Sequence, residues 1–357
     1  MRKLPTPFNT ALVFCLGLGS ASTGFAEQNP FGRPQNATWN VSSEWDYPAY
    51  FAPGQRPQRP TGGDFTSVID TYGPLVVRVG EFDAESTKKP WSSWWYPTRD
   101  STLFQSDAGP GQSPLEKFDQ YALNRGFGTP DSHTFERTHL YEPNAEFWSG
   151  LCDAWAVSSL FVPEPTAPVQ YETIRFEVGD LKALAIKSYE QVEGLTYFGQ
   201  KNEGNWNDFY EDVYPEQFHK FVQKQIYEQH RPFIMDYDPG VQVWNVPVFK
   251  ASMKIVTEPE HTNVLKVTTW LVSADSLTNT RNLNFVGTDE VVREYHYELY
   301  GTPRSDGSFL VDFGIWRENS RQDHPDYLIA VPDQLTSHKS RNTELSSDVV
   351  DLILQGQ

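Results

Sequence analysis

The sequence predicts an α+β protein in which helices come first and an antiparallel sheet follows. Up to about residue 230, apolar residues recur with helical spacing in several segments. From about residue 231 they alternate as in strands, with turn signals such as Asp306-Gly307 between them. Helices and strands that are segregated along the chain are typical of an α+β fold rather than of a doubly wound sheet. We therefore expect one α+β domain at 67–335, with a helical part at about 91–230 and a sheet part at about 231–335.

The first 26 residues have the organisation of a secretory signal peptide. Arg2 and Lys3 precede an apolar run at 11–18, and small residues precede an expected cleavage after Ala26. The apolar run is too short to cross a bilayer as a helix. We expect a secreted or periplasmic protein that is not an integral membrane protein.

The segments outside the predicted domain differ from it in composition. Residues 27–66 are rich in Pro, Gly, Asn, Gln and Ser, and we expect them to form an extended or poorly ordered leader. Residues 336–357 are expected to form a C-terminal tail. Loss of Arg2 and Lys3 changes the net charge from −18 to −20, which argues against nucleic acid and anionic membrane surfaces as partners.

The helical part is expected to open with a strand pair at 67–70 and 75–79, followed by an aromatic loop at 91–97. We interpret this loop as a core plug rather than as the wall of a substrate cleft, since large aromatic residues mostly serve packing. A helix follows at 113–122, where Ser113 and Glu116 form a capping box around a proline.

The next elements are placed by their caps and breakers. A helix beginning near Cys152 is stopped by Pro163, and Asp180 is the expected cap of another helix at 180–189. A further helix starts at Pro215. The predicted strands are 174–178, 233–236, 241–255, 263–272, 291–300 and 308–316, and the last five form an antiparallel meander.

Cys152 is the candidate nucleophile. It is the single cysteine left once the segment carrying Cys15 is removed, so it cannot form an internal disulfide. Composition alone favours a buried small hydrophobe as the role of such a thiol. However, Gly150 before it and small residues at 154 and 156 place it at a helix N-terminus, where the dipole and free N–H groups lower a thiol pKa and can bind an oxyanion.

A cysteine acyltransferase also needs a group that moves protons and an acid that orients it. The chain has eight histidines, and for any one of them a satisfied core or surface position is the more common role. The candidate pairs, in order of preference, are His219 with Asp236, His324 with Asp326, and His296 with Asp312. Against His219, its segment is predicted to be helical, whereas papain-like enzymes carry this histidine on a strand.

The motifs taken together resemble the transglutaminase elicitor family of oomycetes and marine bacteria. The matching stretches are 94–97, 113–119, 148–156, 164–165, 180–184, 215–219, 243–248, 314–316 and 324–327. The resemblance implies a papain-like core, protein-glutamine γ-glutamyltransferase activity and a dependence on calcium. It also implies that 243–247 corresponds to the segment of the oomycete protein that plants recognise. Asp153, Val246 and the stretch 313–316 depart from the family pattern.

The predicted function is that of a secreted transglutaminase that cross-links glutamine and lysine of protein substrates through a thioester on Cys152. Trp155, Trp244 and Asn245 are the candidate substrate-binding residues, although a strand tryptophan such as Trp244 is more often core. Two alternatives stay open: a papain-like cysteine protease or amidase, and a catalytically inactive secreted binding protein similar to an elicitor.

Calcium is the one candidate cofactor, and its ligands stay unknown at this point. The acidic residues of the loop at 199–214 offer oxygen ligands, but their spacing matches no EF-hand, so a solvated surface is the more common explanation. These residues are Glu203, Asp208, Glu211 and Asp212.

Overall fold

The computed structural model describes residues 49–57, 67–201, 213–277 and 279–356. They belong to one compact unit, Tyr47–Gln357. The predicted signal peptide, most of the predicted leader and the acidic residues at 203–212 lie outside the described residues. Within the described part, none of the helices is both long and apolar enough to cross a membrane.

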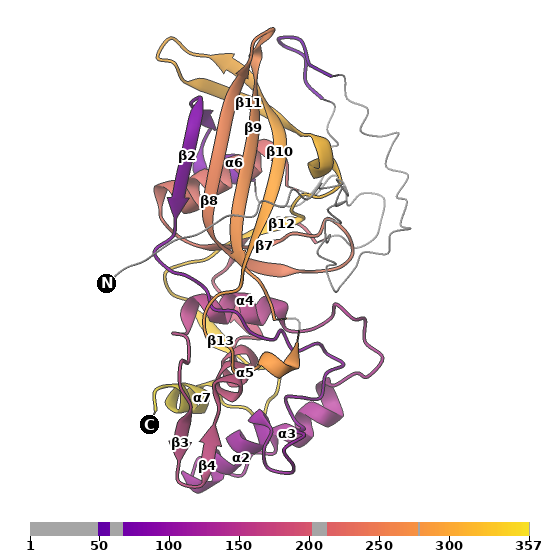
Figure 1. Cartoon of the computed structure of the whole chain (residues 1–357), viewed down its shortest axis with the longest axis vertical. Coiled ribbons are helices and arrows are strands. Elements are labelled where there is room, and N and C mark those ends of the chain that lie inside the picture. Colours follow the sequence, from indigo (N-terminus) through magenta and orange to yellow (C-terminus); the bar gives the residue numbers. More distant parts are fainter. Residues whose placement is uncertain (1–48, 58–66, 202–212, 278, 357) are drawn as a thin grey trace, which may run out of the picture. The chain divides into compact units, whose positions relative to one another are not determined.

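A nine-stranded sheet is the largest element, and all its pairings between strands are antiparallel (Figure 1). The strand order is β1-β11-β10-β9-β8-β7-β12-β6, and β2 pairs with β8. The strands are β1 (Val76–Val77), β2 (Gly80–Glu85), β6 (Thr196–Gly199), β7 (Phe233–Asp236), β8 (Asn245–Glu258), β9 (His261–Ala274), β10 (Glu290–Pro303), β11 (Phe309–Trp316) and β12 (Tyr327–Ala330). The neighbouring strands β7 to β11 confirm the predicted meander.

The remaining elements are helices and two small sheets. The helices are α1 (Val68–Tyr72), α2 (Pro114–Asn124), α3 (Ser132–Phe135), α4 (Cys152–Phe161), α5 (Val178–Ser188), α6 (Pro215–Val222) and α7 (Ser347–Leu354), with π-helical turns η2 (Glu136–Leu140) and η4 (Gln223–Glu228) and 3₁₀ turns η5 (Thr280–Asn282) and η6 (Glu318–Arg321). The small sheets pair β3 (Val169–Tyr171) with β4 (Ile174–Phe176), and β5 (Gln191–Glu193) with β13 (Ser337–Lys339). The predicted α+β composition is therefore confirmed.

Several local predictions are confirmed by hydrogen bonds and burial. The capping box of α2 is formed: the Ser113 N–H donates to the Glu116 carboxylate at 3.0 Å, and the Glu116 N–H donates to Ser113 Oγ at 3.3 Å. The aromatic loop at 91–97 is a core plug, because all seven of its residues are buried.

Three local predictions are corrected. Residues 68–72 form α1 rather than a strand, because the Ser67 side chain caps a helical turn; the second strand of the predicted pair is β1, which pairs with β11. Asp180 lies in the first turn of α5 rather than at its cap, and its carboxylate accepts the Glu177 N–H at 2.8 Å. Residues 336–356, expected as a tail, form β13 and α7, and α7 packs against α5.

Candidate active site

Cys152 is the first residue of α4, as the sequence predicts, and two neighbouring stretches fix its position. The Leu151 N–H donates to the Trp95 carbonyl at 2.9 Å, and residue 98 donates to the Ser149 carbonyl at 2.8 Å. A Cβ at Gly150 would lie 2.5 Å from the Trp95 ring. Glycine is needed here because the aromatic loop packs directly on the backbone before Cys152.

The rest of α4 lies against the large sheet. Residues 156, 157 and 160 of the helix form one buried cluster with Ile234 of β7 and with Tyr327 and Ile329 of β12. This packing directs the first turn of α4, and with it the thiol, towards the ends of β7, β8 and β12.

The sulfur itself is almost fully enclosed. Cys152 is 5% exposed, and its Sγ donates to the Val243 carbonyl at 3.6 Å. Backbone N–H groups of Asn245 and Asp153 hydrogen-bond to the sulfur and favour its charged form, whereas burial and the charges of Asp153 and Asp236 disfavour it. Burial is the largest of these effects, so the pKa of the Cys152 thiol is raised. The expected lowering of this pKa by the helix N-terminus is therefore wrong for this conformation.

Three side chains form a row facing α4. Asp236 of β7 is opposite Asn245 of β8 on one side and Tyr327 of β12 on the other. Residues directly opposite each other in adjacent strands project from the same face of a sheet. The Asn245 side chain also hydrogen-bonds to the Tyr327 hydroxyl. Burial raises the pKa of that hydroxyl, and the charges of Asp236 and Cys152 raise it further.

Asp236 is a fully buried carboxyl group. Its Oδ1 accepts the N–H of Trp244 at 2.8 Å and that of Asp238 at 3.3 Å, while its Oδ2 has no hydrogen-bond partner among the described residues. The N–H of Asp326 donates to the Asp236 backbone carbonyl at 3.1 Å. Burial first, and then the nearby Asp326 charge, hold the pKa of Asp236 well above its ordinary value.

The structure does not bring His219 to Cys152. His219 lies on α6, is 2% exposed, and hydrogen-bonds through Nδ1 to the Tyr297 hydroxyl at 2.7 Å. It lines a cavity together with Met253 of β8. Met253 follows Asn245, the neighbour of the sulfur, by eight residues of strand, which is about 26 Å at ~3.3 Å per residue. Of the predicted triad of Cys152, His219 and Asp236, the structure thus brings together only the cysteine and the aspartate.

The other two candidate histidines contact residues outside their predicted pairs. His324 donates through Nδ1 to the Ser320 carbonyl at 2.9 Å and stacks on Trp316; burial lowers the pKa of the imidazole, and the charge of Asp326 raises it. The ring of His296 interacts with two glutamates, at 3.3 and 3.8 Å, whereas Asp312 pairs with an arginine.

The two predicted substrate-binding tryptophans are packing residues. Trp155 is fully buried, and its Nε1–H donates to the Trp91 carbonyl at 3.0 Å. Trp244 is also buried; its ring packs against Trp95 at 5.2 Å, and its Nε1–H donates to Gln242 at 3.0 Å. Asn245, the third candidate, does lie at the site: its backbone N–H hydrogen-bonds to the sulfur, and its side chain hydrogen-bonds to the Tyr327 hydroxyl. The prediction gave Tyr327 no role, although it lies in the matching stretch 324–327.

Among the described residues, one group of side chains has the composition of a metal site. Asp119, Asp131 and His133 offer two carboxylates and an imidazole whose ligand atoms lie within 4.8 Å of one another. His133 Nδ1 is already 2.8 Å from Asp119 and 3.2 Å from Asp131, so hydrogen bonding alone explains this cluster.

Comparison with known proteins points to the same region of the chain. Residues 143–270, which include Cys152, Asp236 and Asn245, match the family model of the transglutaminase elicitor. The crystal structure of the GP42 transglutaminase from Phytophthora sojae has a similar fold, with a TM-score of 0.57 and 19% sequence identity over 76% of this chain and 90% of that chain. No curated protein matches the chain significantly. The family match and the shared fold confirm the resemblance to the transglutaminase elicitor family that the sequence motifs predict.

Proposed function

We propose that the protein is a cysteine-dependent acyltransferase that joins the side chain of a protein glutamine to a lysine amine through a thioester on Cys152. The observation that carries this proposal is the row of Asp236, Asn245 and Tyr327 that faces the thiol at the start of α4. The transglutaminase elicitor match supports this reaction class. A cysteine at the start of a helix that packs on an antiparallel sheet also agrees with the papain-like core that the resemblance implies.

We assign Asp236 as the group that takes the thiol proton, because it belongs to the row of side chains that faces the thiol. Its charge acts on the Cys152 pKa, after the larger effect of Asp153, so the two groups are electrostatically coupled. Transfer of the proton from sulfur to an ionised Asp236 converts a thiol and a carboxylate into a thiolate and a carboxylic acid. The pair carries one negative charge before and after the transfer, so the step moves a charge and creates none. The N–H groups of Asp153 and Asn245 then stabilise the thiolate.

The thiolate attacks the carboxamide carbon of the glutamine and forms a tetrahedral oxyanion. When this intermediate collapses, the C–N bond breaks, the Asp236 carboxylic acid gives its proton to the leaving nitrogen, and ammonia departs. The lysine amine then attacks the thioester and gives a proton to the Asp236 carboxylate. The C–S bond breaks, the isopeptide forms, and the thiolate regains its proton from Asp236. Water in place of the amine gives a glutamate side chain.

Access to the sulfur requires movement of the connection between β7 and β8. The Val243 carbonyl, at the end of this connection, accepts the S–H bond. Two N–H bonds to Asp236 Oδ1, from Asp238 and Trp244, hold both ends of the connection. A substrate that displaces Val243 frees the thiol and brings an acyl group to it in one movement.

The same burial favours a second candidate function, that of a secreted binding protein without activity. Cys152 is enclosed, its pKa is raised, and none of the described histidines makes a hydrogen bond to the sulfur. Export through the predicted signal peptide is a sequence-based expectation for both proposals, and a calcium requirement is one for the transglutaminase.

The experiment that separates these functions is amine incorporation by the chain from residue 27 onward. The parent, a Cys152→Ser variant and a surface control, Arg281→Gln, are given a glutamine peptide and a fluorescent primary amine, with calcium or with a chelator. Label incorporated by the parent and the control but not by the serine variant supports the transglutaminase. Conversion of glutamine to glutamate without label identifies an amidase, new peptide termini identify a protease, and an unchanged peptide supports the binding protein. Each of these last three results overturns the proposed transglutaminase activity.

A further inference from the structure

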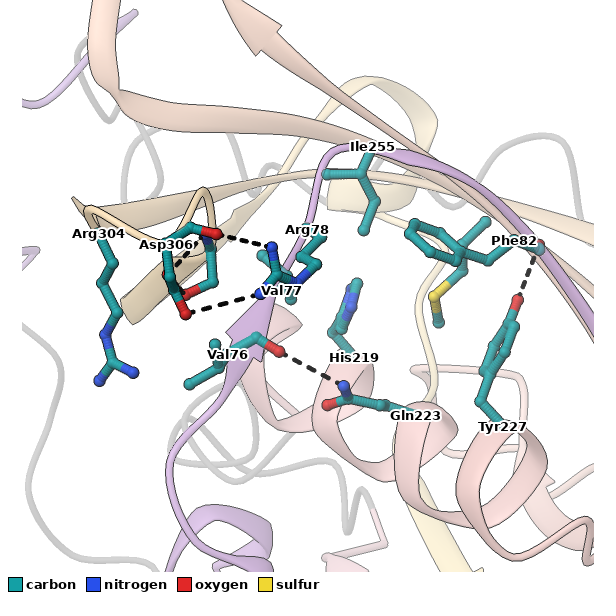
Figure 2. Close-up of a pocket in the computed structure, with 12 residues that line it drawn as sticks. Val76, Val77, Arg78, Phe82, His219, Gln223, Tyr227, Ile255, Arg304 and Asp306 are labelled. Carbon is teal, nitrogen blue, oxygen red and sulfur yellow. Dashed lines mark hydrogen bonds and ion pairs between the residues drawn. The ribbon is translucent and has the colours of Figure 1, made fainter.

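A cavity of about 330 Å³ lies beside α6 (Figure 2), and none of the residues that line it belongs to the site around Cys152. Its lining comes from β1, β2, β8 and the α6–η4 helix, together with the turn that joins β10 and β11. The apolar part of the lining is Val76, Val77, Phe82, Met253 and Ile255. At ~30 Å³ per water molecule, the volume equals about eleven waters, which suits a ligand of a similar number of heavy atoms.

Two polar side chains offer hydrogen bonds inside this apolar lining. Gln223 Oε1 is buried and has no hydrogen-bond partner in the part of the chain that the structure describes, while the Gln223 Nε2 donates to the Val76 carbonyl at 3.4 Å. His219 is held by the Tyr297 hydroxyl through Nδ1, and among the described residues its Nε2 makes no hydrogen bond. Because a buried acceptor without a partner is costly, Gln223 favours a ligand that brings a donor.

The polar rim carries one cation that is available to a ligand. Arg78 is held by Asp306, with its Nη1 2.9 Å from the Asp306 carbonyl and its Nη2 3.6 Å from the carboxylate. Arg304, at the left of Figure 2, also lines the cavity; its exposed guanidinium makes no hydrogen bond or ion pair with any described residue, and its charge acts on the Asp306 carboxylate. Burial lowers the pKa of His219 to about 3, so at neutral pH its imidazole is uncharged and adds no second cation.

We propose that this cavity binds a small amphipathic hydroxy acid, with its apolar body against the β-strand side chains, its hydroxyl on Gln223 Oε1 and its single carboxylate on Arg304. One available guanidinium matches one negative charge. A ligand with more charge is disfavoured because the chain has a net charge of −18. The site is independent of the acyl transfer proposed for Cys152.

The test uses 3-hydroxyoctanoate, which has eleven heavy atoms, with octanoate and 3-octanol as comparison ligands. Calorimetry on the parent is expected to give affinities in the order hydroxy acid, acid, alcohol. Arg304→Gln should weaken both acids about tenfold and leave the alcohol unchanged, since only the charge-assisted bond is lost. Gln223→Leu should remove the preference of the hydroxy acid over octanoate. The matched control, Arg281→Gln, removes an exposed arginine on η5 and should bind all three ligands as the parent does.

Location is tested separately by the ¹⁵N resonances of the His219 imidazole, which should shift on titration with the hydroxy acid and keep their position with the solvent alone. Cys152→Ser should bind the hydroxy acid with unchanged affinity, so that loss of the acyl-transfer proposal leaves this one standing. Absence of binding to the parent at millimolar concentrations overturns the proposal. Equal weakening by the Arg304 and Arg281 variants, or binding without a change in the His219 resonances, overturns it as well.

Discussion

Asp236→Asn is the substitution that best separates the effect of a buried carboxyl group on stability from its role in proton transfer. Asparagine keeps the Oδ1 acceptor for the Trp244 and Asp238 N–H groups, so the connection between β7 and β8 retains its two anchors. It removes only the ability to ionise and to carry a proton. We expect this variant to be more stable than the parent at neutral pH and far less active.

The sign of the stability change follows from the direction in which the pKa moves on folding. Burial raises the pKa of Asp236 in the folded protein above the ordinary value of ~3.9, so the folded state holds the proton more tightly than the unfolded chain does. The protonated carboxyl stabilises the folded state fully below the unfolded pKa of ~3.9. This stabilisation is lost as the pH rises through the raised pKa that Asp236 has in the folded protein. A tenfold change in the proton affinity of the carboxyl group corresponds to about 1.4 kcal/mol of unfolding free energy. The asparagine variant does not lose this contribution, so its melting temperature at pH 7 should exceed that of the parent, and the difference should vanish near pH 3.

The activity of the same variant should fall by about 10²–10⁴-fold, which is the usual contribution of a general acid or base. The parent should lose activity as the pH falls through the raised pKa of Asp236, at a higher pH than an exposed carboxyl group would give. The matched control is Asp275→Asn, which also removes a carboxyl whose pKa burial raises but leaves the site around Cys152 unchanged. Full transamidation by the Asp236 variant would refute the assigned proton transfer, and a lower melting temperature at pH 7 would refute the electrostatic argument.

Three further predictions concern the surroundings of the thiol and the core. Gly150→Ala places a Cβ 2.5 Å from the Trp95 ring and should lower the unfolding free energy by about 1–3 kcal/mol in urea titrations; an unchanged midpoint would contradict the close packing. Lys187→Met leaves the buried Glu136 without its cation, while Glu190 keeps its ion pair with Arg341, and should cost about 3–5 kcal/mol by the same measurement; a neutral result would mean that the Glu136 carboxyl takes up a proton. Alkylation of Cys152 by iodoacetamide should be slow at pH 7, and its rate should rise tenfold per pH unit up to pH 9, because burial raises the thiol pKa. A rate that levels off near pH 8.5 would indicate an ordinary exposed thiol.

Local features of the site could be predicted from sequence because they depend on neighbouring residues. The glycine before Cys152 and the small residues after it indicated a helix start, and α4 begins at Cys152. Ser113 and Glu116 indicated a capping box, which is formed. The strands β7 to β11 followed from alternation, with boundaries within a few residues of those observed.

The partners of the thiol could not be predicted in the same way. The order Cys152, His219, Asp236 fits a triad along the chain. It carries no information on which end of β8, a strand of fourteen residues, each of these side chains lies near. Asp236 and Tyr327 become neighbours only through the register of β7 and β12. The raised thiol pKa depends on burial under the connection between β7 and β8, which no local pattern encodes.

The enclosure of Cys152 also has a consequence for how the chain reaches its folded state. The sulfur and the carbonyl that covers it are 91 residues apart in sequence, and Tyr327 is still further away. Contacts of such separation form slowly, because a long loop must close before any of them is gained. During that interval the thiol is open to disulfide exchange with other chains, whereas the completed fold shields it. Refolding in an oxidising medium should therefore yield disulfide-linked dimers unless a reductant is present until β7, β8 and β12 have assembled.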